Sequence, residues 1–168
     1  MADTTSTDTE IIKVSEVPLW YRSAQVIIAA GILGLAVSFG LVLQDYYQAE
    51  TVAGVFQQSR KPILQYRLEK GAWPSNFNFD KVPADVESYD FSAAVSGMRS
   101  AEIRGVWRFT AEEVEGRTIP KVIFKADEDS PSVQRILFVT DLKIDDGREK
   151  AGKLLVTGTQ AEFMLMAE

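Results

Sequence analysis

The sequence predicts an α+β protein in which a long N-terminal membrane-spanning helix continues into an amphipathic helix packed on a small antiparallel sheet. Three features predict it: an uncharged apolar run near the N-terminus, a helical stripe of apolar residues after that run, and strand-like segments separated by turns in the remainder. We therefore divide the chain into a tail at 1–22, a membrane-spanning helix at 23–44, an amphipathic helix at 45–70 and an antiparallel β domain at 71–168.

The composition argues against most enzyme classes. The 168 residues include neither histidine nor cysteine, which removes histidine-dependent and thiol catalysis and almost all zinc and non-haem iron sites. Two acidic runs, at 127–129 and 145–149, lack the spacing of a calcium-binding loop. The net charge of −6 disfavours a nucleic-acid binder, which needs a basic face. The sequence thus predicts a non-enzymatic protein with no cofactor, no metal and no nucleic-acid partner.

The apolar run from Val26 to Leu43 has the length of a membrane span. Extended back to Ala24, it contains 20 uncharged residues, which cover about 30 Å of helix, the thickness of the hydrocarbon core of a bilayer. Aromatic residues with polar tips flank the run, as is typical of bilayer interfaces: Trp20, Tyr21, Tyr46 and Tyr47. The alternative is a cleaved signal peptide in which Ala36 and Ser38 are the small residues before the cleavage site, but the leading segment is long and acidic rather than short and basic. We therefore expect membrane lipid around this helix.

The charges on either side of the run predict its orientation. Lys13, Arg22 and the amino terminus precede it, whereas the first cation after it is Arg60. The positive-inside rule then places the N-terminus in the cytoplasm and the bulk of the chain in the periplasm. The sequence therefore predicts a single-pass protein of a bacterial inner membrane.

Small residues form a stripe within the predicted span. Ala30, Gly34 and Ser38 recur at every fourth position and so share one helix face. Such a face lets another membrane helix approach closely, whether from a second copy or from another component. The alternative is that small residues are simply common in membrane helices.

The segment before the span contains a short apolar peptide, interrupted by Pro18. Its apolar residues are Ile11, Ile12, Val14, Val17 and Leu19. One interpretation is a cytoplasmic docking peptide that adds as a strand to the sheet edge of a soluble assembly protein. The other is a juxtamembrane stretch that lies in the headgroup layer.

Beyond the span the pattern stays helical and becomes amphipathic. Residues at spacings of 3, 4, 3, 4 and 3 form one stripe: Ala49, Val52, Phe56, Ser59, Ile63 and Tyr66. Lys70 in the last turn, followed by Gly71 and Pro74, predicts the end of the helix near residue 70. Pro62 lies inside the helix and is expected to kink it or to divide it in two.

The remainder of the chain predicts a loop, strands and turns. A loop is expected at 71–88. Strands are expected at 103–110, 121–126, 135–144 and 154–166, the last being one strand or a pair. Turns are expected at 115–117 and at Asp146–Gly147. The apolar face of this sheet needs a cover, and the helix stripe is the candidate.

The end of the long helix resembles that of type IV pilins and type II secretion pseudopilins. In those proteins the helix ends in a turn with Tyr, then Glu, Gly, an aromatic residue and Pro, and the matching positions here are Tyr66, Glu69, Gly71, Trp73 and Pro74. Glycine ends the helix, the aromatic ring caps the core, and proline turns the chain toward the sheet. The resemblance covers residues 24–80 and implies the pilin fold, a long helix followed by an antiparallel sheet. The chain differs in three respects: the segment before the apolar run is acidic, no glutamate lies within 24–43, and the cysteine pair that many pilins have near the C-terminus is missing.

The resemblance implies a structural or assembly component of a type IV pilus or of a type II secretion-like apparatus. A second layout is similar: single-pass assembly-platform proteins of the same machines have a cytoplasmic peptide that binds an actin-like partner, one membrane helix, a helical stalk and a small periplasmic α/β domain. The segment at 10–22 lies where such a peptide would be. The sequence leaves both functions open.

Overall fold

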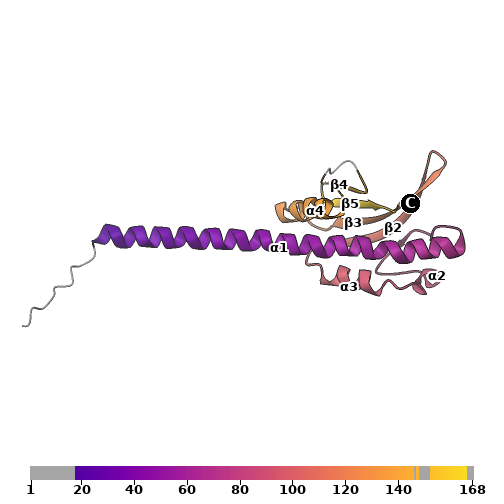
Figure 1. The fold of residues 1–168 in the computed structure, drawn as a ribbon, viewed down its shortest axis with the longest axis horizontal. Helices are drawn as coiled ribbons and strands as arrows, with labels where there is room; N and C mark the ends of the chain where they lie inside the picture. The colour runs from indigo at the N-terminus through magenta and orange to yellow at the C-terminus, as the bar shows by residue number, and fades with distance from the viewer. Residues whose placement is uncertain (1–17, 146, 148–151, 166–168) are drawn as a thin grey trace, which may run out of the picture. The chain divides into compact units, whose positions relative to one another are not determined.

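The protein is an α+β chain whose described residues divide into two compact units, a first unit that ends at Gly40 and a second unit that begins at Leu41. The computed structural model describes residues 18–145, 147 and 152–165. The elements in chain order are α1 (Leu19–Lys70), β1 (Phe77–Asn78), α2 (Ala84–Glu87), α3 (Ser92–Ser100), β2 (Gly105–Val114), β3 (Arg117–Ala126), α4 (Pro131–Ile144), β4 (Leu154–Thr157) and β5 (Gln160–Met164) (Figure 1).

Helix α1 is a single helix of 52 residues that contributes to both units. It includes Pro62, so the division into two helices considered for this proline does not occur. Its end is the predicted one. Gly71, at φ +70°, adopts the left-handed conformation that favours glycine, and its N–H donates to the carbonyl of Arg67 over 3.0 Å.

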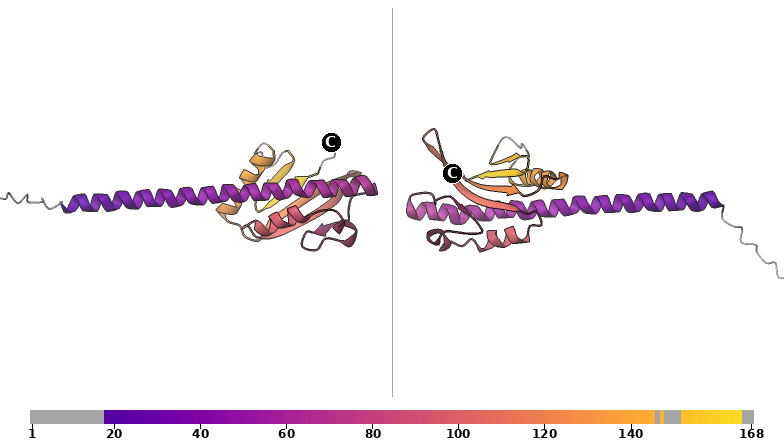
Figure 2. Two further views of the ribbon diagram at one scale, coloured as in Figure 1. Left: turned by 60° about the horizontal axis from the view of Figure 1, so that its bottom comes forward. Right: turned by 180° about the vertical axis from the view of Figure 1, so that it is seen from behind.

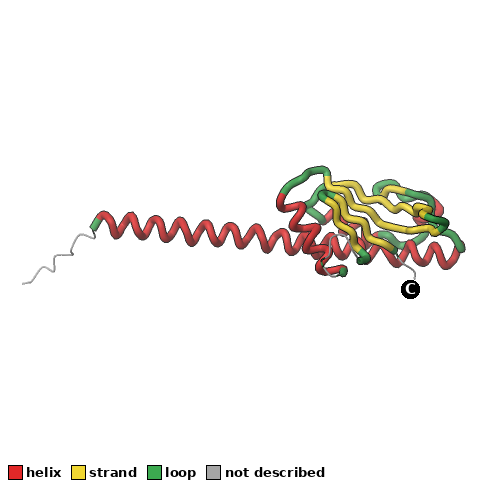
Figure 3. The backbone as a smooth tube through the Cα atoms, turned by 90° about the horizontal axis from the view of Figure 1, so that it is seen from above, coloured by secondary structure: helices red, strands yellow, loops and turns green. Residues whose placement is uncertain are grey.

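The five strands form one antiparallel sheet in the order β1-β2-β3-β5-β4 (Figure 3). One row of paired residues crosses all five strands, and each of its members is buried: Phe77, Phe109, Val122, Phe163 and Leu154. Because neighbouring residues of a strand alternate between faces, this row marks the face that packs on the core. The turn predicted at 115–117 is confirmed, since Glu115 and Gly116 have positive φ between β2 and β3.

The core lies between this sheet face and the part of α1 that belongs to the second unit. The ring of Phe56 lies 4.9 Å from that of Trp107 on β2 and 5.7 Å from that of Phe163 on β5, between ring centres. All residues of the predicted stripe are buried except Tyr66, which is half-buried. On another side α1 meets α3, since a Cβ atom added at Gly97 would lie 2.7 Å from Cγ2 of Val55. In this unit α1 therefore has the sheet on one side and α2 and α3 on the other (Figures 1 and 2).

The strand predicted at 135–144 is wrong, because these residues belong to helix α4. Ser130 caps the helix by accepting a hydrogen bond from the N–H of Val133, and Pro131 occupies the first turn. The buried residues of α4 recur at helical spacing: Val133, Ile136, Leu137, Thr140 and Asp141. This period and the Ser-Pro start were the signals for a helix, whereas the apolar and β-branched composition had favoured a strand.

Three short elements were not predicted. The expected loop at 71–88 contains β1 and α2, and α3 follows it. Asp90 begins the turn into α3, because its Oδ1 accepts hydrogen bonds from both the N–H and the Oγ of Ser92. Of the turn predicted at Asp146–Gly147, Asp146 lies outside the described residues, and Gly147 has φ +77°.

Candidate membrane-anchoring site

The first unit exposes the apolar part of α1. This part is long and apolar enough to cross a membrane, and none of the residues of its most apolar stretch is buried in the structure. Ile27 is 72% exposed, and Ile32, which lies about 140° further round the helix, is 63% exposed. A helix that is apolar all round cannot be covered by one neighbouring face, and this is typical of a membrane span.

The small-residue stripe at Ala30, Gly34 and Ser38 lies on this exposed helix. The Oγ of Ser38 donates to the carbonyl of Gly34 over 2.9 Å, so the hydroxyl is satisfied within the helix and does not require water. A Cβ added at Gly34 would meet no atom of the described residues within 4 Å. The structure thus leaves room beside the stripe for another helix.

The candidate docking peptide lies almost entirely outside the described residues. Ile11, Ile12, Val14 and Val17 are not described, and Leu19 is the first residue of α1. The helix begins directly after Pro18, whose carbonyl accepts from the N–H of Tyr21 over 2.9 Å.

The first charge after the apolar run, Asp45, is buried in the second unit. Its Oδ1 accepts a hydrogen bond from the Oγ of Ser132, and its Oδ2 accepts one from Nε of Arg135 over 2.5 Å. Both partners lie in the first turns of α4. A buried carboxylate is tolerated when it is paired and hydrogen-bonded, and Asp45 meets both conditions.

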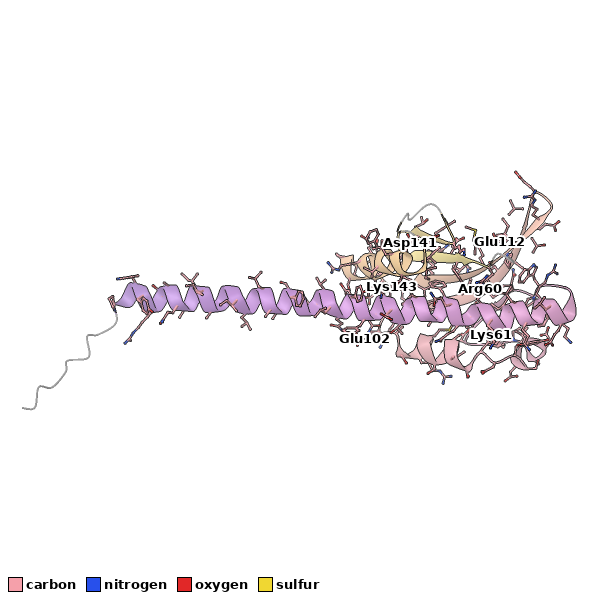
Figure 4. All side chains as sticks on the ribbon, viewed as in Figure 1. Arg60, Lys61, Glu102, Glu112, Asp141 and Lys143 are labelled. Atoms are coloured by element: carbon pink, nitrogen blue, oxygen red, sulfur yellow. The ribbon has the colours of Figure 1, made fainter. Side chains whose placement is uncertain are left out.

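The same stretch of α1 holds the chain that follows α3. Nε2 of Gln44 donates to Oε2 of Glu102 over 2.6 Å, and one helical turn later Oε1 of Gln48 accepts from the N–H of Glu102 over 2.9 Å. Figure 4 labels Glu102 beside α1. Two glutamines one turn apart therefore fix one residue by its side chain and by its backbone.

The end of α4 contacts α1 one turn further along. Nζ of Lys143 lies 2.9 Å from Oε2 of Glu50 and 4.0 Å from the ring centre of Tyr46. The hydrogen bond to Glu50, and next the one to Tyr46, raise the pKa of Lys143. Thr140 Oγ1 also donates to the carbonyl of Ala49 over 3.3 Å. We call residues 44–50 of α1, together with these partners and those of Asp45, Gln44 and Gln48, the helix collar.

The helix collar begins where the predicted span ends, and sequence reasoning did not find it. Its partners lie 54 to 93 residues further along the chain, so no local spacing connects them. The available signal was the position of Asp45 as the first charge after the apolar run. The collar is the set of contacts that joins α4 and the segment after α3 to the helix that carries the candidate span.

The turn after α1 brings together the residues on which the pilin resemblance rests. Tyr66 Oη donates to Oδ2 of Asp85 over 3.0 Å, which raises the pKa of Tyr66. The guanidinium of Arg67 lies 5.3 Å from the ring centre of Trp73. Pro74, next to that ring, is buried.

Glu69, the remaining position of the resemblance, is a hydrogen-bond acceptor. It accepts from Gln65 Nε2 over 3.0 Å and from Tyr89 Oη over 2.8 Å. These two bonds, in that order, hold the pKa of Glu69 below its usual value. The turn is therefore fastened to α2 and to the chain after it through Tyr66 and Glu69.

No metal-binding cluster is formed by the residues that the structure describes, since no group of three or more acidic side chains lies close enough to hold an ion. The acidic run at 127–129 is within the described chain, whereas Asp146 and Glu149 of the other run are not.

Comparison with known proteins gives no match of any kind. No family model matches the chain, no curated protein resembles it significantly, and no solved structure does so either.

Proposed function

We propose that the protein is a non-enzymatic, single-pass membrane protein that serves as a structural or assembly component of a type IV pilus or of a type II secretion-like apparatus. Its N-terminus lies in the cytoplasm and its second unit in the periplasm of a bacterium. Its partners are membrane lipid and other membrane helices, either of the same protein or of other components of the machine.

One observation carries the proposal: the helix that exposes the apolar run is also the helix on which the core of the second unit is built. Phe56 and Ile63 of α1 are fully buried, and the same uninterrupted helix extends back through the apolar run. A cleaved signal sequence has no need to continue into a folded core. A permanent anchor has to continue into the folded domain that it holds at the membrane.

The order of the elements and the turn support a pilin-like arrangement. A long N-terminal helix followed by an antiparallel sheet that packs on its second half is what the resemblance implies, and the described residues have this arrangement. The positions on which the resemblance rests lie in one fastened turn between α1 and the sheet. The absence of histidine and cysteine from the sequence agrees with a structural role.

A second candidate is a bitopic assembly-platform or adaptor protein whose cytoplasmic peptide, at 10–21, docks a soluble partner. The specific observation in its favour is that the apolar run contains no glutamate. In filament subunits that side chain pairs with the N-terminus of a neighbour, so its absence favours an assembly role over a regular place in a filament.

The lack of cysteine permits a direct test of the anchor. Single cysteines are introduced by Thr5→Cys in the tail and by Ser96→Cys on the exposed side of α3. In cells with a permeabilised outer membrane, a membrane-impermeant maleimide is expected to label Ser96→Cys at once and Thr5→Cys after lysis. The reverse pattern, or recovery of the full-length chain in the soluble fraction without detergent, overturns the proposal.

A second measurement separates the two candidates. The intact mass of the protein from membranes of its own bacterium shows whether the mature chain begins near residues 23–26, as a processed filament subunit would, or keeps its N-terminus, as an adaptor would. For an adaptor, deletion of residues 10–21 is expected to abolish binding of a soluble partner while membrane insertion is unchanged.

A further inference from the structure

A cavity of about 410 Å³ opens in the second unit beside the helix collar. Its walls are α1 at 41–48, the residues after α3, the loop before α4 and the start of α4. Leu41 belongs to the uncharged run, whereas Asp45 is the first charge after it, so the cavity spans the change from apolar to polar sequence on α1. Cavities of this volume are typical of small-molecule sites.

The cavity is lined by both signs of charge. Asp45 and Arg135 neutralise each other, although the Arg135 side chain is 46% exposed and keeps further N–H donors for a ligand. Arg104 and Glu128 also line the cavity, and neither side chain forms a hydrogen bond or ion pair within the described part of the chain. Glu102, on the same wall, is held by Gln44.

These charges select the chemistry of a ligand. A bare anion would meet Arg104 but would be opposed by Glu102 and Glu128, and a bare cation would be opposed by the two arginines. A zwitterion that carries a phosphate and an ammonium group satisfies both. Arginine is well suited to the phosphate because its planar fork of donors matches the phosphate oxygens.

We propose that this cavity binds the headgroup of a zwitterionic phospholipid, with the phosphate toward Arg104 and Arg135 and the ammonium toward Glu128. The inference rests on the proposed function, because it needs the apolar run of α1 to lie in a bilayer. At about 1.5 Å per residue, the residues at 44–48 then lie within one or two turns of the end of the hydrocarbon, at the depth of the headgroups.

The test uses the full chain in a mild detergent and native mass spectrometry. The probes are phosphatidylethanolamine, phosphatidylglycerol and a diacylglycerol with the same acyl chains. Phosphatidylethanolamine is expected to remain bound to the wild type more than either of the others. Arg104→Gln should lower its retention by about tenfold, as expected for the loss of a charge-assisted hydrogen bond. Glu128→Gln should remove the preference over phosphatidylglycerol.

Arg99→Gln on α3 is the matched control, because Arg99 is exposed and does not line this cavity. It should retain lipid as the wild type does. Equal retention by Arg104→Gln and Arg99→Gln overturns the proposal. Binding of inorganic phosphate alone, with the same dependence on Arg104 and with displacement of the lipid, also overturns it and assigns the site to free phosphate.

The two proposals fail in different ways. If the protein needs detergent for extraction but Arg104→Gln retains lipid normally, the headgroup site is wrong and the anchor stands. If the chain is soluble without detergent, the proposed function is wrong. An unfolding temperature equal to that of the wild type shows, for each variant, that the substitution has not disturbed the fold.

Discussion

Arg135 Nε donates a hydrogen bond to Asp45 Oδ2 over 2.5 Å and thereby joins α4 to the first charged residue after the apolar run. The two residues are 90 positions apart, and the Asp45 side chain is only 9% exposed. Removal of the arginine leaves a buried carboxylate whose remaining hydrogen-bond donor, among the described residues, is the Oγ of Ser132. The free-energy cost of losing this pair is therefore set by the buried Asp45, even though Arg135 itself is half-exposed.

We expect Arg135→Ala to lower the free energy of unfolding of the second unit by about 1 to 2 kcal/mol, a value reduced for the solvent exposure of the arginine. Urea unfolding of the full chain in mild detergent, followed by tryptophan fluorescence, measures it. Arg99→Ala, which removes an exposed arginine outside the helix collar, should change the unfolding free energy little. Equal stability of the two variants would show that the pair does not fasten α4.

Phe56 tests whether α1 is the centre of the core. Its side chain is fully buried between Trp107 and Phe163, so Phe56→Ala should cost about 3 to 5 kcal/mol. Leu68→Ala on the same helix is the control, because Leu68 is 85% exposed and its truncation should cost less than about 0.5 kcal/mol. Similar losses in the two variants would contradict the packing of α1 on the sheet.

Two helical glycines are expected to respond to alanine with opposite signs. At Gly54 of α1 a Cβ meets no atom of the described residues within 4 Å, so Gly54→Ala should raise the unfolding free energy by about 0.5 to 1 kcal/mol through helix propensity. At Gly97 of α3 the Cβ would lie 2.7 Å from the stiff side chain of Val55. Gly97→Ala should therefore lower the unfolding free energy, by about 1 kcal/mol net. A stabilising Gly97→Ala would show that α3 does not pack closely on α1.

The outer face of the sheet carries a charge network that predicts acid sensitivity. Lys121 on β3 lies 2.9 Å from both Glu112 and Glu162. Burial acts to raise the pKa of Glu162, but hydrogen bonds from Lys121 and Gln160 outweigh it, and the pKa is lowered. The stabilisation is therefore complete above the ordinary glutamate pKa of about 4.3 and is lost as the pH falls through the lower folded value.

Glu162→Gln removes this contribution. The variant should be less stable than the wild type at pH 7, by under about 1 kcal/mol because the groups are partly exposed, and the difference should shrink below about pH 4. Glu113→Gln, an exposed position in the β2–β3 hairpin, is the control. Unfolding free energies measured at several pH values test this prediction. A difference between the wild type and Glu162→Gln that grows in acid would contradict it.

The small-residue stripe predicts self-association or association with another membrane helix. Gly34→Leu should weaken this association, since a large side chain keeps helices apart, whereas a Cβ at Gly34 meets no atom of the described residues within 4 Å. Gly40→Leu is the matched control, because Gly40 is also unhindered and lies about 120° from the centre of the stripe. Cross-linking in lipid measures the association. Equal yields of cross-linked product for the two variants would show that the stripe does not mediate it.

Local patterns predicted those parts of the fold that depend on a single segment. The apolar run, the stripe from Ala49 to Ile63 and the end of α1 at Gly71 follow from composition, period and backbone preference, and each is found in the structure. The β2–β3 hairpin belongs to the same class, because its turn residues and its alternation lie next to each other in the sequence.

Residues 131–144 show where local patterns gave the wrong answer. Their apolar and β-branched composition suits a strand, and their buried positions suit a helix, so composition alone did not decide. The helix is favoured because Ser130 and Pro131 start it and because its buried face packs beside α1. The strand order, with β5 between β3 and β4, likewise depends on pairing between distant segments.

By itself the sequence determined that a long helix leads from an apolar run into an amphipathic stripe, and that a sheet is needed to cover that stripe. Only the tertiary structure decided which residues meet at the helix collar and around the cavity beside it. The physical reason is that helical period and turn preference act over a few residues, whereas the pairing of Asp45 with Arg135 is fixed by how α4 packs on α1.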